Sequence, residues 1–177
     1  MFYKRNTQFY KKAIKKYGIS AQGVHWNSKY TQYKRFEILT QYIKKDISNS
    51  TIVDIGCGFG EYYKYLKNNH KLPQQYIGID CESFMIDIAK KRFPQIKFTV
   101  ANALTDQLVK SDYYICSGAL NILGFKDIKI FIQNCFDYST KGFVFNILKS
   151  DSFIDIDISE LLIFCRTFTQ NIYTKNN

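Results

Sequence analysis

One segment, Val53-Asp54-Ile55-Gly56-Cys57-Gly58-Phe59-Gly60-Glu61, carries the strongest structural signal in this chain. It continues an apolar run that begins at Thr51, and a helical pattern follows it. Glycines at such a junction allow a sharp turn, and they let a ligand approach the backbone and the N-terminus of the helix closely. The segment therefore predicts a strand, a ligand-binding turn and a helix, in that order.

Downstream of this segment, short β-rich runs alternate with helical patterns. Strands are expected at 51–55, 76–80, 96–100, 113–117 and 143–147, and helices near 61–69, 83–92 and 127–138, with a short helix near 105–110. Repetition of strand, helix and strand predicts an α/β fold, with a mostly parallel sheet covered by helices on both faces. Ligands of such sheets bind beyond the carboxyl ends of the strands.

The glycine segment resembles the first motif of class I S-adenosylmethionine-dependent methyltransferases, which have a Rossmann-like sheet. An acidic residue stands two positions before the first of three alternating glycines, and position 61 lacks the third glycine of the dinucleotide-binding pattern. An NAD-dependent oxidoreductase is therefore disfavoured. The resemblance implies S-adenosylmethionine as cofactor, with a binding loop whose residues are Asp54, Gly56, Cys57, Gly58 and Gly60.

Three further segments extend the resemblance to roughly residues 50–148. Asp80 ends the next expected strand and precedes Cys81; in the family, this acid accepts hydrogen bonds from the ribose hydroxyls, and the alternative is a helix N-cap. Asn102 stands where the family usually has Asp near adenine, and Ala103 follows it; the alternative is a simple turn. Ser117 and Gly118 would flank the methionine part and the methyl group.

The first 48 residues are read as a basic helical lid over the cofactor site, and residues 49–177 as the cofactor-binding domain. Residues 1–50 hold 11 Lys or Arg and 2 acidic residues, and amphipathic helices are expected at 5–17 and 29–45. The excess positive charge could bind RNA, an anionic lipid surface or an acidic substrate. The alternative is that these residues form a solvated helix face.

Two residues of the lid are candidates for the chemistry. His25 is a weak candidate for a general base, with a surface or capping role as the alternative. Arg35 could clamp the methionine carboxylate, or it could be a solvated charge. The five cysteines are widely spaced, so free thiols and no metal site are expected, although Cys116 lies near the expected site. The sequence contains no run of about 18 apolar residues, so no membrane span is expected. A cytoplasmic location is expected.

The C-terminal end fits the family less well, because only 29 residues follow Leu148. They supply a helix around 159–168 and at most a short strand at 171–174, so the last strands of the methyltransferase fold are expected to be missing. The fifth strand would then have an unprotected edge. We expect the protein to form a homodimer through this edge, to cover the edge with residues 159–174, or to be poorly stable.

These observations favour a methyltransferase that acts on an oxygen, nitrogen or carbon nucleophile of a small molecule. The loop after the fourth strand lacks the Asn-Pro-Pro-Tyr type of sequence that amino-methylating DNA enzymes use. An RNA methyltransferase and a truncated, non-catalytic cofactor-binding relative stay open as alternatives. The methyl acceptor, the catalytic base and the oligomeric state are not determined by the sequence.

Overall fold

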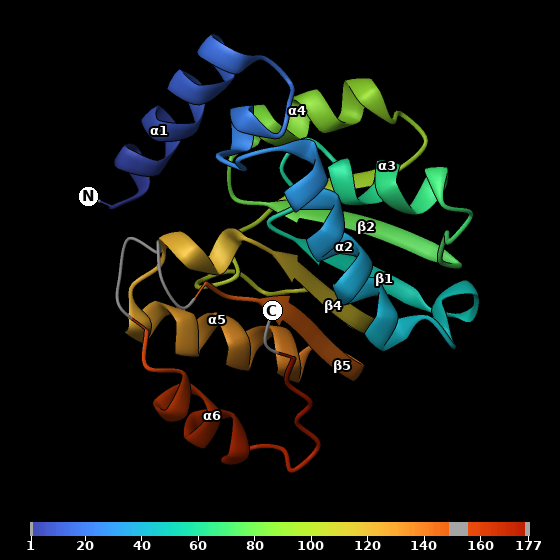
Figure 1. Cartoon of the computed structure of the whole chain (residues 1–177), viewed down its shortest axis with the longest axis vertical. Coiled ribbons are helices and arrows are strands. Elements are labelled where there is room, and N and C mark those ends of the chain that lie inside the picture. Colours follow the sequence, from blue (N-terminus) through green and yellow to red (C-terminus); the bar gives the residue numbers. More distant parts are fainter. Residues whose placement is uncertain (1, 149–155, 176–177) are drawn as a thin grey trace.

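Five strands form one parallel sheet in the computed structural model, which describes residues 2–148 and 156–175. They span Thr51–Ile55 (β1), Gln75–Asp80 (β2), Lys97–Val100 (β3), Ser111–Ser117 (β4) and Ser139–Asn146 (β5). Their order is β3-β2-β1-β4-β5, and every neighbouring pair is parallel (Figure 1). The expected α/β sheet is confirmed, and its strand order reverses between β1 and β4.

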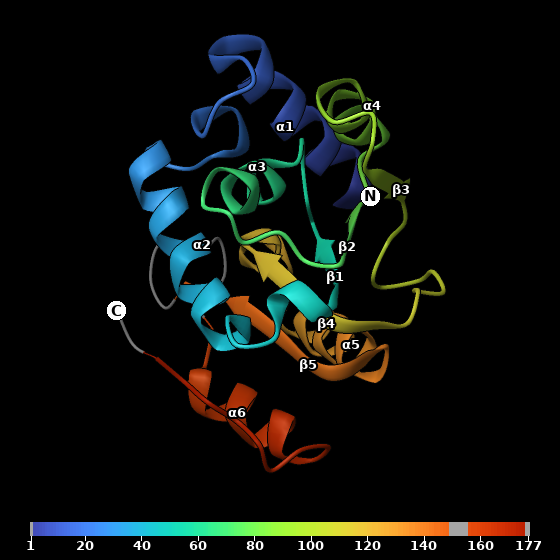
Figure 2. The ribbon, with the colours of Figure 1, turned by 90° about the vertical axis from the view of Figure 1, so that its right-hand side faces the viewer.

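Helices cover both faces of the sheet (Figures 1 and 2). They span Phe2–Tyr17 (α1), Lys29–Ile43 (α2), Glu61–Asn68 (α3), Ser83–Arg92 (α4), Phe125–Asp137 (α5) and Ile158–Arg166 (α6). Local signals set several ends. Gly18 follows α1 with a φ of 67°, a left-handed conformation that suits glycine. A capping box of Ser28 and Thr31 begins α2.

Two apolar cores lie on opposite faces of the sheet. Ile52 and Ile115 belong to the core that contains residues of α2, α3 and α4. Val53 and Cys116, their neighbours in the chain, belong to the core that contains residues of α5 and α6. Successive residues of a strand point to opposite faces, so strands covered on both faces must be apolar almost throughout.

The N-terminal helix α1 lies beside α4 (Figures 1 and 2). The Thr7 hydroxyl donates hydrogen bonds to both carboxylate oxygens of Glu82, at 2.9 and 3.0 Å. The Lys11 ammonium lies 5.3 Å from the ring centroid of Phe84. These contacts hold α1 near the carboxyl end of β2, where the sequence predicts the ligand.

Two expected elements are not formed. Residues 105–110 do not form a helix, because the Asn102 carbonyl accepts the amides of Thr105 and Asp106 in an isolated turn. Beyond this turn, Leu108 is buried and the Val109 carbonyl accepts the hydroxyl of Tyr114. Residues 171–174 do not form a strand either. A 3₁₀-helix at Ala119–Ile122 was not predicted.

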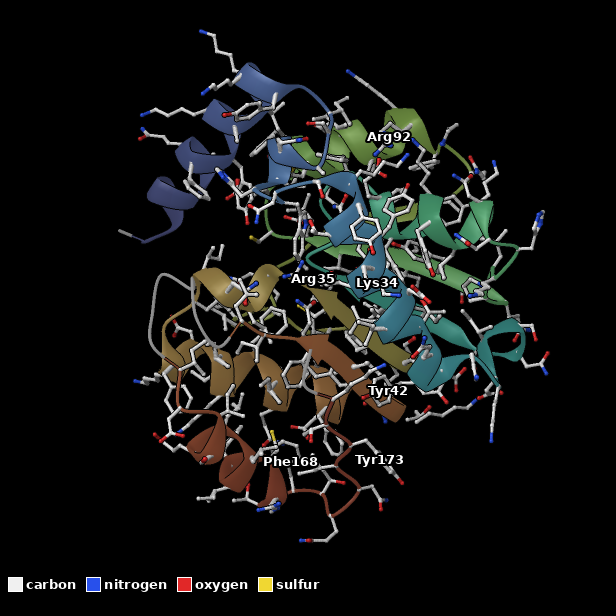
Figure 3. The ribbon with its side chains drawn as sticks, in the orientation of Figure 1. Lys34, Arg35, Tyr42, Arg92, Phe168 and Tyr173 are labelled. Carbon is white, nitrogen blue, oxygen red and sulfur yellow. The ribbon has the colours of Figure 1, made fainter. Side chains whose placement is uncertain are left out.

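Among the described residues, no strand follows β5, which therefore forms one edge of the sheet. Its Phe143 and Phe145 are partly buried in the same core as Phe168 and Ile172 of the C-terminal segment. The Phe168 ring also packs against Phe136 of α5, with centroids 4.8 Å apart (Figure 3). The C-terminal segment and the edge strand thus contribute side chains to one apolar core, and coverage of the unpaired edge itself stays a prediction. The homodimer stays a prediction.

Candidate functional site

A cavity of about 400 Å³ opens at the carboxyl ends of the strands. Its opposite wall comes from α1, from the 3₁₀-helix Gln22–Val24 and from the first turns of α2. The residues predicted from the sequence that line it are His25, Arg35, Asp54, Gly56, Cys57, Gly58, Asp80, Cys81, Asn102, Ala103, Ser117 and Gly118. The fold therefore gathers residues from five separate segments around one space.

The glycine loop is tied to the end of β2 by backbone hydrogen bonds. The amides of Gly56 and Cys57 both donate to the carbonyl of Ile79, at 2.8 and 3.0 Å. The amide of Gly58 donates to the Asp80 carboxylate at 2.8 Å. The loop and the acidic residue that ends β2 thus form one bonded unit.

Three glycines show where space is filled and where it is open. A Cβ on Gly56 would lie 2.5 Å from the Cβ of Ala119, and one on Gly118 would lie 2.7 Å from Cζ2 of Trp26. A Cβ on Gly58 would have only one contact within 4 Å, with Val24 at 3.9 Å. Protein atoms pack against Gly56 and Gly118, whereas the space at Gly58 is left for a ligand.

Gly60, which the sequence assigns to the cofactor loop, does not line the cavity. It caps α3 with a φ of 82°, and an added Cβ would lie 3.1 Å from the ring of Phe93. Backbone conformation and packing therefore both require a glycine at position 60. The loop is also held by Arg92 of α4, which donates to the carbonyl of Phe59 and pairs with Glu61 at 2.5 Å (Figure 3).

Asp80 is buried at the end of β2, and both of its oxygens accept backbone amides. One accepts from Gly58 and the other from Glu82, at 2.8 and 2.9 Å. Burial raises the pKa of Asp80 to about 6, against the effect of these hydrogen bonds. Each carboxylate oxygen has a further lone pair, so Asp80 can accept additional hydrogen bonds from a ligand.

Asp54 is a second buried carboxylate, at the carboxyl end of β1. The hydroxyl of Tyr76 donates to it at 2.5 Å. Burial raises the pKa of Asp54 to about 7, although the Tyr76 hydrogen bond opposes this shift. The ionised form is therefore costly in the free protein, and a cationic ligand at this side chain would favour it.

Tyr10 of α1 lines the cavity, although the sequence did not mark it as a site residue. Burial raises the pKa of Tyr10, and the negative charge of Asp80 raises it further. Glu82 also lines the cavity, and it is buried as the acceptor of the Thr7 hydroxyl. Helical periodicity shows which residues of α1 face inward, but it does not show that they face a ligand site.

His25 and Phe9 bring the lid segment over the cavity. Their rings are stacked, with centroids 3.6 Å apart and planes at 12°. Burial lowers the pKa of His25, and a hydrogen bond to the backbone of Phe9 partly opposes this shift. The lowered pKa favours the neutral form of the imidazole. His25 also has a φ of 62°, which is uncommon outside glycine.

Arg35 points from α2 toward the cavity (Figure 3). Its guanidinium lies 4.6 Å from the ring centroid of Trp26, and it donates to the carbonyl of Thr31 at 3.3 Å. Within residues 2–148 and 156–175, no ion pair to Arg35 is formed. Its guanidinium is therefore positioned by an aromatic ring, and its proposed role with the methionine carboxylate stays a prediction.

The turn around Asn102 shows that this residue has a local role. Its side-chain oxygen accepts the amide of Leu104 at 3.0 Å, and its own amide donates to Asp106 at 2.9 Å. The alternative turn role of Asn102 is thus present in the structure. The proposed contact with adenine, through Asn102 and the buried Ala103, stays a prediction.

Two side chains at the end of β4, those of Ser117 and Cys116, differ in their relation to the cavity. The Ser117 hydroxyl is buried and has no hydrogen-bond partner among the described residues. Cys116 does not line the cavity, and burial raises its pKa to about 12. A thiol with such a pKa stays protonated at neutral pH and is a poor nucleophile. Cys116 is therefore not suited to covalent chemistry.

No three or more His, Cys, Asp or Glu side chains gather among the described residues in a way that could hold a metal ion. None of the helices in the described ranges combines the length and the apolar character that crossing a membrane requires. The expected cytoplasmic location stays a prediction.

Comparison with known proteins gives consistent results. A family model described as "Methyltransferase domain" matches residues 52–142. Protein 235L of Invertebrate iridescent virus 6, assigned by name to the methyltransferases, is 33% identical over 48% of this chain and 34% of its own length. The ubiquinone/menaquinone biosynthesis C-methyltransferase UbiE of Campylobacter jejuni is 32% identical over 45% of this chain and 33% of its own length.

The chain spans about a third of the length of the curated relatives it matches. A solved structure that resembles it more completely is a TehB-like SAM-dependent methyltransferase from Corynebacterium glutamicum. That likeness has a TM-score of 0.65 at 18% identity, and it covers 92% of this chain and 82% of the other. At this level of identity the likeness concerns the fold.

Proposed function

Because this chain belongs to the methyltransferase-domain family, we propose that it binds S-adenosylmethionine and transfers its methyl group to a small-molecule oxygen, nitrogen or carbon nucleophile. The observation that carries the proposal is the composition of the cavity. Two buried carboxylates with raised pKa values, Asp54 and Asp80, share it with the unpaired guanidinium of Arg35 and the open space at Gly58.

The lining residues fit this cofactor group by group. Its ammonium suits Asp54, whose ionised form needs a nearby cation, and its carboxylate suits the fork of donors of Arg35. Its ribose hydroxyls suit the remaining lone pairs of Asp80. Ser117 and Gly118, which line the cavity, are proposed to flank the methionine part and the methyl group. Asn102 and Ala103 are proposed for adenine.

When bound, S-adenosylmethionine supplies an electrophilic methyl group that a nucleophile takes in one displacement. The chain mainly contributes binding and orientation. Residues 1–48 are proposed to act as a lid, since Tyr10 and Trp26 line the cavity opposite the strands and would exclude water from it. His25, the neutral imidazole of the lining, is proposed to accept a proton where the acceptor must lose one.

Calorimetry tests the cofactor step directly. Wild-type protein is titrated with S-adenosylmethionine, S-adenosylhomocysteine and NAD under identical conditions. We expect both adenosyl compounds to bind and NAD not to bind. Binding of NAD instead, or of none of the three, would contradict the proposal. Binding without any methyl transfer to a broad panel of acceptors would favour the non-catalytic alternative.

One observation supports RNA as a second class of acceptor. Lys11, Lys12, Lys15 and Lys16 are all exposed on α1, close to the cavity wall. If they bind phosphates, affinity for single-stranded RNA must fall steeply with salt, because each contact releases counterions. Changing all four to Gln should then abolish RNA binding and spare the cofactor. A flat salt response would leave only the small-molecule proposal.

A further inference from the structure

The cavity has a polar part and an apolar part. Its buried carboxylates, Asp54 and Asp80, belong to β1 and β2. Beyond β4 and β5 the lining is mostly apolar, and its apolar members there are Ala119, Ile122, Leu123 and Leu148. Because β2 and β5 are three strand spacings apart in the sheet, their ends are separated by roughly 14 Å. The two parts of the cavity can therefore hold different chemical groups.

Ile122 and Leu148 differ from the other apolar residues of this part, because neither belongs to the two apolar cores of the described residues. Ala119 and Leu123 pack against the core that contains α5 residues, and Phe131, which also lines the cavity, is a member of that core. Ile122 and Leu148 are partly buried, and both line the cavity. Their apolar surface therefore faces the cavity instead of a core, and an apolar ligand would remove it from water.

A hydrogen bond holds Ile122 and Leu148, here called the apolar wall, close together. Ile122 ends the 3₁₀-helix Ala119–Ile122, and Leu148 follows β5. The amide of Leu148 donates to the side-chain oxygen of Asn121, the residue before Ile122, at 3.0 Å. The backbone beyond β5 is thus tied to the 3₁₀-helix, so the apolar wall is formed before a ligand binds.

The charged residue that α5 contributes to the cavity disfavours an anionic ligand. Asp127 lines the cavity from the first turn of α5, where the helix dipole stabilises a carboxylate. No ion pair to Asp127 forms in the part of the chain that the structure describes. A second negative charge in this part of the cavity would be repelled by the first.

We propose that the apolar wall binds the methyl acceptor, and that this acceptor is an uncharged, apolar small molecule. The inference rests on the proposed function, in which the cofactor occupies the ends of β1 and β2. Ser117 and Gly118, proposed to flank the methyl group, directly precede the 3₁₀-helix that carries Ile122. A nucleophile placed to take the methyl group would therefore have the apolar wall beside it.

The test uses 2-naphthol and 2-naphthoate, which share one apolar ring system and differ in charge. With S-adenosylhomocysteine saturating, wild-type protein should bind 2-naphthol at least about tenfold more tightly, because burial of an unpaired carboxylate is costly. Ile122→Asn should weaken 2-naphthol binding at least about fivefold, since apolar contact area is lost. Ile130→Asn is the matched control, because Ile130 is 37% exposed on α5 and does not line the cavity. Its affinity for 2-naphthol should equal that of wild type.

Three outcomes would overturn the inference. They are tighter binding of 2-naphthoate than of 2-naphthol by wild type, equal 2-naphthol affinity in Ile122→Asn and wild type, and an equal loss of S-adenosylhomocysteine affinity in Ile122→Asn. Should Ile122→Asn fail to fold in a thermal melt, Leu148→Asn replaces it with the same expectations. Wild-type protein that fails to bind S-adenosylhomocysteine would instead overturn the proposed function.

Discussion

The two halves of the sheet differ in whether their buried polar side chains have hydrogen-bond partners. At the carboxyl end of β2, the Asp80 carboxylate accepts the amides of Gly58 and Glu82, so this end is bonded before any ligand arrives. At the ends of β4 and β5, Ser117 and Asn146 have no partners among the described residues. The first half is preformed by hydrogen bonds, whereas the end of the second half contains buried polar atoms that have no hydrogen-bond partner among the described residues.

This difference follows the proposed division of labour. A cofactor that is the same in every turnover favours a rigid, preorganised loop, because less ordering is needed on binding. If the β1–β2 half binds the cofactor and is rigid, substitutions in it should change S-adenosylhomocysteine affinity and the free energy of unfolding.

The largest effect is expected for Gly58→Val. A β-branched side chain at a φ of 54° is strained, and it would fill the open space at the loop. S-adenosylhomocysteine affinity should fall at least about 100-fold, measured by calorimetry. Gly124→Val is the control, since Gly124 has a φ of −66° and no contacts within 4 Å of an added Cβ. Equal affinity in Gly58→Val and wild type would show that the loop has another role.

Asp80→Ala should have the next largest effect. It removes the acceptor proposed for two ribose hydroxyls, at about 1.5 to 3 kcal/mol for each hydrogen bond to a charged group. Asp80→Asn keeps the shape and one acceptor oxygen, so its affinity for S-adenosylhomocysteine should fall between those of Asp80→Ala and wild type. An Asp80→Ala protein that folds and binds with unchanged affinity would rule out the ribose contact.

Two ion pairs, one in each half of the sheet, allow the rigidity of the two halves to be compared. Arg92 and Glu61 are 18% and 12% exposed and hold the glycine loop, whereas Lys129 and Glu160, between α5 and α6, are 30% and 53% exposed. Arg92→Gln should lower the free energy of unfolding by about 2 to 3 kcal/mol, because it leaves a largely buried carboxylate unpaired. Lys129→Gln should cost less than about 1 kcal/mol. Equal losses in urea denaturation would contradict the preformed loop.

The smallest effect concerns pH. Burial raises the pKa of Asp54 to about 7 and that of Asp80 to about 6, from 3.8. Between about pH 4 and 7 the folded state holds protons that the unfolded state has released, so the free protein should lose stability as pH rises. Binding of a cation at Asp54 requires the ionised form, so S-adenosylhomocysteine affinity should rise about tenfold from pH 6 to pH 8. Asp54→Asn should flatten this rise; a flat profile in wild type would exclude the Asp54 contact.

Several features were predictable from the sequence because they depend on neighbours in the chain. The glycine loop, the acid that ends β2 and the strand pattern all appear where the spacing predicts them. The expected helix at 105–110 failed because Leu108 was drawn into the core and the Val109 carbonyl into a hydrogen bond with Tyr114, two tertiary contacts. Gly60 does not line the cavity, and the ring of Phe93 next to it explains a glycine as well as a ligand does, so its place in the cofactor loop stays a prediction.

Local periodicity and turn chemistry therefore determined the parallel α/β sheet and the loop at its carboxyl edge, because both arise from residues close in sequence. Tertiary structure alone decided which side chains line the cavity. Tyr10 reaches the neighbourhood of Asp80 only because α1 packs beside α4. Asn146 is the one polar residue of the apolar run 143–148, and the lack of partners for its amide becomes visible only once β5 pairs with β4 and α2 covers both. Burial and hydrogen-bond partners depend on contacts across the whole chain, which spacing within one segment does not encode.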